Sequence, residues 1–210
     1  ASGAASRMFK SLFSTLEEYD GSDAAYEKIV SDQGFQSVWN FFKSIEKFAF
    51  FQALKDVHQQ LHGISLEESL LRRDYTKVLT SLLSEDGLNY GNLPKGLLQF
   101  HRYEDGSRTA LEEHLVEGAN YCRDKNGVVR LHFTVSPEHR EKFLARIAEV
   151  KDTFEQQFNV SYHISFSEQK ASTDTIAVNP DNSPFREDNG ELLFRPAGHG
   201  ALIENLNDID

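Results

Sequence analysis

The sequence predicts an α/β protein whose sheet is interrupted by a long helical insertion. Between residues 9 and 83, apolar residues recur at intervals of three and four, the period of an amphipathic helix. Between residues 128 and 168, two stretches of alternating apolar and polar residues flank a helical stretch. A strand, a helix and a strand in this order form a parallel pair with a right-handed crossover. We therefore assign residues 1–210 to part of one α/β domain and residues 9–90 to a helical insertion within it.

The most apolar stretch of the insertion is FQSVWNFFKSIEKFAFFQALKDVHQQL, residues 35–61. Its spacing places six apolar residues along one face of a continuous helix: Phe35, Val38, Trp39, Phe42, Ile45 and Ala49. Further phenylalanines widen this face, which predicts a helix that packs on two sides, in the core or against a partner helix. Ser65 and Glu68 stand three apart before apolar residues, and this capping-box pattern predicts another helix through Leu83.

The stretch EDGLNYGNLPKG ends the helical block, and shorter elements follow it. A helix around RTALEEHLVEGANYC precedes the turn DKNG and the strand VVRLHFTV. Ser136 caps and Pro137 begins the next helix, which runs to about Phe158 and leads into a second strand, VSYHISFS. A short strand in DTIAV, a hairpin turned at DNG, the glycine-rich AGHG and a closing helix ALIENLND complete the expected order.

The composition indicates a folded cytosolic protein. Hydrophobic residues make up 39% of the chain, enough for a core, and the single cysteine, Cys122, cannot form an internal disulfide. No apolar run approaches the roughly 18 residues of a membrane span, and the amino terminus lacks the pattern of a signal peptide. The net charge of −11 disfavours nucleic acid and membrane surfaces as partners. Because salt screens distant charge over about 8 Å, local arginines and lysines can still hold a small phosphorylated ligand.

The chain opens on ASGAASRM, residues 1–8, in which small residues lead directly into Arg7 and the start of a helix. Such a loop is how α/β proteins hold phosphates, because backbone N–H groups converge on the anion and the helix dipole adds partial positive charge. The dipole contributes only about 0.3–1 kcal/mol per charge, so firm binding needs a cation such as Arg7. The same run is also compatible with plain packing or with a helix cap.

Four short motifs occur in the order found in sugar nucleotidyltransferases. ASGAASRM resembles the A-G-G-x-G-T-R-M signature of these enzymes, the uridylyl-transferring sugar pyrophosphorylases in particular. LPKG, residues 93–96, resembles their P-K-G element, and SFSEQ, residues 165–169, is similar to their F-x-Q strand end. FRPAGHGALIENL is similar to their P-x-G-H-G loop and helix. End to end, the chain also resembles an uncharacterised bacterial domain family associated with this superfamily, and we expect it to be an excerpt of a longer protein.

The resemblance implies a Rossmann-like nucleotide-diphospho-sugar transferase sheet, mostly parallel, that carries the helical insertion. It assigns catalytic roles to Arg7, which would neutralise the pyrophosphate leaving group, and to Lys95, which would stabilise the phosphates undergoing substitution. The implied nucleotide-binding positions form a phosphate loop, a strand end and a base and ribose pocket: Ser2, Gly3, Ala4, Ala5, Ser6, Gln169, Gly198, His199 and Gly200. The implied partners are a nucleoside triphosphate and a phosphorylated sugar, and the implied cofactor is Mg²⁺.

The chain departs from the family pattern at several points. Ser2 and Ala5 stand where the family prefers glycine, so these positions must avoid positive φ or accept strain, and the Ala5 methyl is expected to narrow the passage for a phosphate. The two cations are further apart in the sequence than usual, which fits a helical insertion between them. The aspartate that holds Mg²⁺ in the superfamily is expected beyond residue 210, and neither Asp208 nor Asp210 is assigned to it.

Other candidate residues have simpler interpretations. His58 and His62 share the i, i+4 spacing of zinc ligands on a helix, but without further ligands nearby we interpret them as part of a polar helix face. Lys95, taken without the accompanying motifs, is a surface lysine after a proline turn. No metal ligand is assigned within the chain.

Three hypotheses for function stay open. The leading one is an enzyme that transfers a nucleoside monophosphate, with uridylyl as the expected group, from the triphosphate to a sugar 1-phosphate or related acceptor and releases pyrophosphate. The second is a module that keeps the fold and binds the nucleotide without transfer, because the phosphate loop is altered. The third is an interaction protein in which the helical insertion presents its aromatic face to a partner.

Overall fold

Two compact units make up the fold. The computed structural model describes residues 5–209, apart from the side chains of Ser6 and His199. The chain divides into Gly3–Glu117, called the helical unit, and Gly118–Asp210, called the strand unit.

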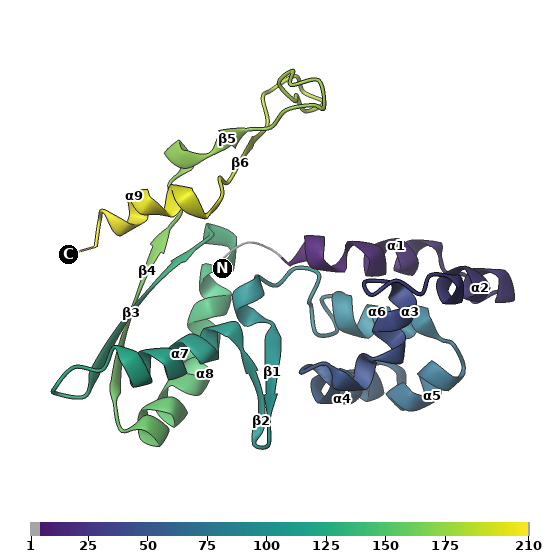
Figure 1. The fold of residues 1–210 in the computed structure, drawn as a ribbon, viewed down its shortest axis with the longest axis horizontal. Helices are drawn as coiled ribbons and strands as arrows, with labels where there is room; N and C mark the ends of the chain where they lie inside the picture. Colours follow the sequence, from purple (N-terminus) through teal and green to yellow (C-terminus); the bar gives the residue numbers. More distant parts are fainter. Residues whose placement is uncertain (1–4, 210) are drawn as a thin grey trace. The chain divides into compact units, whose positions relative to one another are not determined.

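The helical unit consists of short helices and a hairpin (Figure 1). Its elements in chain order are η1 (Ser6–Phe9), α1 (Lys10–Glu18), α2 (Asp23–Ser31), α3 (Val38–Lys43), η2 (Ile45–Lys47), α4 (Phe51–His62), α5 (Leu66–Leu71), α6 (Tyr75–Leu83), η3 (Lys95–Leu97), β1 (Gln99–Tyr103) and β2 (Gly106–Thr109), where η marks a 3-10 helix. The next helix, α7 (Ala110–Tyr121), crosses from this unit into the strand unit. The helical block predicted over residues 9–83 is therefore confirmed.

The centre of the helical unit is α6, which contacts α1, α4 and α5. Val78, Leu79 and Leu82 of α6 have no exposed surface, and Leu54 of α4 and Leu66 of α5 are buried in the same cluster. Fully burying one such aliphatic side chain contributes about 1.5–3 kcal/mol. The apolar period of the sequence therefore produces one shared core rather than separate helices.

The prediction of one continuous helix over residues 35–61 is wrong. The chain breaks between α3 and α4, where Phe48 is extended, with φ −72° and ψ 145°. The break lets aromatic rings stack: the centroids of Phe48 and Phe50 are 5.0 Å apart, and those of Phe42 and Tyr75 are 3.9 Å apart. Ring contacts of this kind therefore accompany the break in the helix.

Two predictions for helix starts have different outcomes. The cap of α5 is confirmed, because Ser65 Oγ accepts a hydrogen bond from the N–H of Glu68 at 3.1 Å. The prediction that Phe35 lies on the apolar face of a helix is wrong. Helix α3 begins only after its cap, Ser37, and Phe35 is 89% exposed. The ring therefore lies outside the helix that was expected to bury it.

The hairpin β1–β2 has no counterpart among the predicted elements. Its turn joins Tyr103 to Gly106, and Gly106 has φ +140°, a conformation that favours glycine. The Ser107 hydroxyl donates to the carbonyl of Ala49 at 2.6 Å, which fastens the hairpin to the helical core. Because the strand residues are mostly polar, apolar alternation does not reveal them.

The strand unit continues from the end of α7 (Figure 1). Its elements are β3 (Val128–Val135), η4 (Pro137–His139), α8 (Arg140–Phe158), β4 (Ser161–Glu168), η5 (Ala171–Thr173), β5 (Thr175–Ile176), β6 (Phe194–Arg195), η6 (His199–Leu202) and α9 (Ile203–Leu206). Strands β3 and β4 pair in parallel over their whole length, from Val128 opposite Ser161 to Val135 opposite Glu168. The predicted strand, helix and strand are therefore confirmed, and so is the parallel pair.

The two faces of the β3–β4 pair differ in chemistry. Val129 and Tyr162, which face each other in the register, are buried, and the ring centroids of Phe133 and Phe143 of α8 are 6.5 Å apart. This apolar face packs against the crossover helix. The residues between these positions are polar and lie on the opposite face.

The chain is a mixed α/β protein in which helix predominates. Each of the sheets found in residues 5–209 has two strands: β1–β2, β3–β4 and β5–β6. In the same residues, the helices are too short or too polar for any of them to cross a membrane.

Candidate nucleotide-binding site

Ala5, directly before η1, lies beside Leu93, which precedes η3 by two residues. The N–H of Ala5 donates to the carbonyl of Leu93 at 3.1 Å, so a backbone hydrogen bond joins two of the four motifs. Pro94 is buried directly after Leu93, and Lys95 begins η3. Ser2, Gly3 and Ala4 lie outside the described residues.

Ala5 adopts an ordinary helical conformation. Its φ of −82° avoids the positive values for which the family prefers glycine, so the residue is unstrained. The side chain has no exposed surface and belongs to the hydrophobic core together with Phe9 and Leu12. Its methyl group therefore packs inside the helical unit, and its N–H is engaged by Leu93.

Two exposed cations lie on these joined segments. Arg7 belongs to η1, Lys95 begins η3, and both side chains are exposed. In the part of the chain that the structure describes, neither forms an ion pair. Solvent therefore reaches both cations, and they lie on segments that the Ala5–Leu93 hydrogen bond joins.

The strand unit brings together the other two motifs. Gln169 directly follows β4, its N–H donates to the carbonyl of Val135, and its Nε2 donates to the carbonyl of Ala197 at 3.3 Å. This contact joins the strand-end motif to the glycine-rich loop. Gly198 and Gly200 are exposed with open space where a Cβ would lie, and the backbone of His199 begins η6.

The site residues divide between the two units. Arg7 and Lys95 belong to the helical unit, whereas Gln169 and the Gly198–Gly200 loop belong to the strand unit. Within each unit, one hydrogen bond joins two of the motifs: Ala5 to Leu93 in the helical unit and Gln169 to Ala197 in the strand unit.

The closing helix is anchored at the same strand end. Asn205 is buried, and its Nδ2 donates to Ser167 Oγ at 3.1 Å and to the carbonyl of Glu168 at 2.8 Å. Asp208 of the following turn pairs with Lys170 at 2.7 Å. These contacts hold α9 against β4, next to Gln169.

The described residues do not fit a metal centre. Among them, no three His, Cys, Asp or Glu side chains gather in a way that could hold an ion. Asp208, which the sequence leaves unassigned, is engaged by Lys170. The metal-binding aspartate expected beyond residue 210 stays a prediction.

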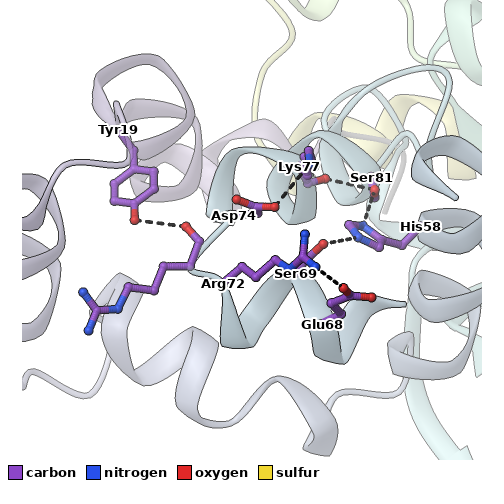
Figure 2. Close-up of polar contacts among 9 residues, drawn as sticks. Tyr19, His58, Glu68, Ser69, Arg72, Asp74, Lys77 and Ser81 are labelled. Carbon is purple, nitrogen blue, oxygen red and sulfur yellow. Dashed lines mark hydrogen bonds and ion pairs between the residues drawn. The ribbon is translucent and has the colours of Figure 1, made fainter. Parts of the chain in front are cut away.

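The interpretation of His58 as part of a polar helix face is wrong. His58 has no exposed surface, and its two ring nitrogens lie 2.8 Å from the hydroxyls of Ser81 and Ser69 (Figure 2). Burial, with a smaller contribution in the same direction from the neighbouring His62, lowers the pKa of His58 to about 4. Since both nitrogens are engaged, the side chain is a buried polar link between α4, α5 and α6.

Sequence reasoning missed a second polar cluster on the strand pair. His132 of β3 contacts the hydroxyls of Ser165 at 2.8 Å and Ser167 at 2.9 Å, both on β4. Thr134 lies 3.0 Å from Ser167, which also accepts from Asn205. The signal was present in the alternation, because these residues occupy the polar positions of both predicted strands.

The structure defines a mixed α/β protein with a helical unit and a parallel strand pair. A family model described as a domain of unknown function, DUF4301, matches residues 1–210, so the chain belongs to that family. No curated protein and no solved structure matches the chain.

Proposed function

We propose that the protein is a nucleotidyltransferase of the sugar-nucleotide type. It transfers a nucleoside monophosphate, with uridylyl as the expected group, from the triphosphate to a sugar 1-phosphate or related phosphorylated acceptor. Pyrophosphate is the second product. The order and character of four motifs, and the way in which they meet in pairs, support this proposal.

The hydrogen bond from Ala5 to Leu93 is the observation that carries the proposal. It connects the small-residue opening with the Pro94–Lys95 turn, although the whole helical block lies between them in the sequence. It thereby brings the two exposed cations onto adjacent segments of one unit. Two such cations can bind a polyphosphate, although the net charge of the whole chain is −11.

The chemistry assigned to the two cations is electrostatic. Substitution at the α-phosphate moves negative charge onto the leaving pyrophosphate, where the guanidinium of Arg7 can bind two oxygens at once. The ammonium of Lys95 stabilises charge on the phosphate under attack. The acceptor phosphate is itself the nucleophile, so the protein supplies no covalent intermediate and acts by positioning and charge stabilisation.

The finer fold that accompanies this function is a mostly parallel, Rossmann-like sheet of the nucleotide-diphospho-sugar transferase type. The parallel pair β3–β4 with its crossover helix α8 supports it as one unit of such a sheet. Gln169 and the glycine-rich loop lie at the carboxyl end of β4, the end at which open parallel sheets bind ligands.

The test combines binding and turnover in the longest natural protein that contains this chain. UTP is titrated calorimetrically, and pyrophosphate release is then assayed with a panel of sugar 1-phosphates. We expect Arg7→Ala and Lys95→Ala each to lower turnover by at least about a hundredfold, the scale of losing one charge-stabilising donor. Lys47→Ala is the matched control, because Lys47 is also an exposed lysine of a 3-10 helix. Near-normal turnover in both variants would overturn the proposal.

One observation favours a second candidate, a nucleotide-binding module without transfer. The N–H of Ala5 is engaged by Leu93 and its methyl group is in the core, so this residue offers the phosphate neither an amide nor open space. In that case UTP binds and Arg7→Ala weakens binding, but no acceptor in the panel releases pyrophosphate.

A further inference from the structure

A cleft separate from the nucleotide motifs opens in the helical unit between α1, α2 and α3. Its volume is about 230 Å³. Drug-sized ligands occupy pockets from roughly 300 Å³ upward, so this cleft suits a smaller molecule, of the size of one ring or a short alkyl chain.

The inner wall of the cleft is apolar. Tyr19 of α1 is buried, and its hydroxyl donates to the carbonyl of Arg73 at 3.0 Å, so the phenol oxygen is already satisfied (Figure 2). Ala25 and Ile29 of α2 and Val38 of α3 complete this wall and are half-buried. A compact apolar body placed against this wall would remove these side chains from water.

The outer rim is charged and carries an excess negative charge. Glu18 and Lys28 pair with each other at 2.8 Å across the rim, and both are exposed. Asp32 also lines the cleft, and among residues 5–209 it forms no ion pair; one of its oxygens accepts the N–H of Gly34. The rim therefore holds two carboxylates and one ammonium, and a second ammonium would balance it.

We propose that this cleft binds a small primary amine, with an aryl or short alkyl body against Tyr19, Ile29 and Val38 and the ammonium at Asp32. The wall selects the apolar body, and the carboxylate of Asp32 selects the sign of the head group. The site does not depend on the proposed nucleotide chemistry, because it shares no residue with the motifs assigned to it.

The test uses phenethylamine as the probe, with the full chain followed by ¹H–¹⁵N NMR at pH 7. We expect saturable shifts confined to residues of α1, α2 and the start of α3. 2-Phenylethanol and phenylacetate have the same body with a neutral and an acidic head, and we expect the alcohol to bind more weakly and the acid weakest. Equal affinity for phenylacetate, or shifts outside these helices, would overturn the proposal.

Three exposed substitutions separate the charge argument from folding. Asp32→Asn is expected to weaken phenethylamine binding about two- to fivefold, the scale of one solvent-exposed ion pair. Lys28→Ala frees the carboxylate of Glu18 and is expected to tighten phenethylamine binding by a similar factor. Asp86→Asn removes an exposed carboxylate outside the cleft and should leave affinity unchanged. If Asp32→Asn and Asp86→Asn behave alike, the carboxylate at the rim does not recognise the amine and the proposal fails.

Discussion

The Nδ1 atom of His58 lies 2.8 Å from the hydroxyl oxygen of Ser81, and neither side chain has any exposed surface. Ser81 also donates its hydroxyl proton to the carbonyl of Lys77 at 2.9 Å (Figure 2). A hydroxyl has one proton, so in this arrangement His58 Nδ1 donates and Ser81 accepts. The other nitrogen, Nε2, then accepts from the hydroxyl of Ser69. The neutral imidazole is thus fully satisfied, and protonation would require Ser69 to turn its proton away.

The first prediction is a loss of stability in acid. His58 has a pKa of about 4 in the fold, below its ordinary 6.5, because burial disfavours the charged ring. Between these values the unfolded chain binds a proton that the folded chain does not, so the free energy of unfolding falls as the pH drops from 6.5 to 4. The full loss amounts to about 3 kcal/mol. Urea denaturation followed by the fluorescence of Trp39, the single tryptophan, reports on the helical unit at each pH.

A variant and a control accompany this pH series. In His58→Gln the drop between pH 6.5 and 4 should largely disappear, whereas His114→Gln, at an exposed position, should keep it. The buried His139 of the strand unit also has a pKa lowered by burial, and the His58→Gln variant leaves that contribution in place. An unchanged pH profile in His58→Gln would contradict the assignment.

The second prediction concerns the two serines. Ser69→Ala and Ser81→Ala each leave one nitrogen of His58 buried without a partner, which costs about 1–3 kcal/mol of unfolding free energy. Ser14→Ala is the control, because Ser14 is exposed and bonds only its own helix. Urea denaturation at pH 7.5 measures all three, and equal stability of the three variants would show that the hydroxyls do not support the histidine.

The third prediction concerns the turn after α6. A Cβ on Gly87 would lie 2.7 Å from the carbonyl carbon of Ser81 and closer still to its oxygen, and a backbone group in the core helix cannot move aside cheaply. Gly87→Ala should therefore lose at least about 1–3 kcal/mol of stability, the scale of overpacking. Gly200→Ala has open space and an ordinary φ, so its melting temperature should match the parent. Similar melting temperatures for the two variants would contradict the close approach.

Much of the strand unit could be predicted because its signals are local. The alternation of Val129, Leu131 and Phe133 with polar residues specifies a strand with one buried face, and the structure has that strand. Pro137 begins the 3-10 turn η4, as the fixed φ of proline favours, and the α-helix expected from this position begins three residues later, at Arg140. Such patterns depend only on neighbours in the sequence, so no knowledge of the tertiary fold is required.

The features that escaped prediction depend on distant partners. The break between α3 and α4 accompanies the stacking of Phe42 on Tyr75 of α6, and the helical period alone carries no trace of it. The burial of His58 follows from Ser69 and Ser81, which come from two other helices. The hydrogen bonds of Ala5 to Leu93 and of Gln169 to Ala197 likewise join segments far apart in the sequence, and no local pattern encodes either of them.

The fourth prediction concerns the anchor of α9. Asn205 Nδ2 donates to the carbonyl of Glu168 and to the hydroxyl of Ser167, so its amide nitrogen must face β4. Asn205→Ala removes both donors and should raise amide hydrogen exchange throughout α9 by about tenfold or more, equivalent to about 1.4 kcal/mol of local stability. Asn205→Asp should be worse still, because it places a carboxylate against a carbonyl.

The matched control for this anchor is the exposed pair at the end of α9. Asp208→Asn breaks only the ion pair with Lys170, which is solvent-exposed and contributes between zero and about 1 kcal/mol. Hydrogen exchange in α9 should therefore change much less than in Asn205→Ala. If the two variants exchange equally fast, the ion pair rather than the buried amide holds the helix. The order of the glycine-rich loop before α9 then depends on the salt concentration. If Asn205→Ala alone exchanges fast, the order of that loop rests on a neutral contact that salt does not weaken.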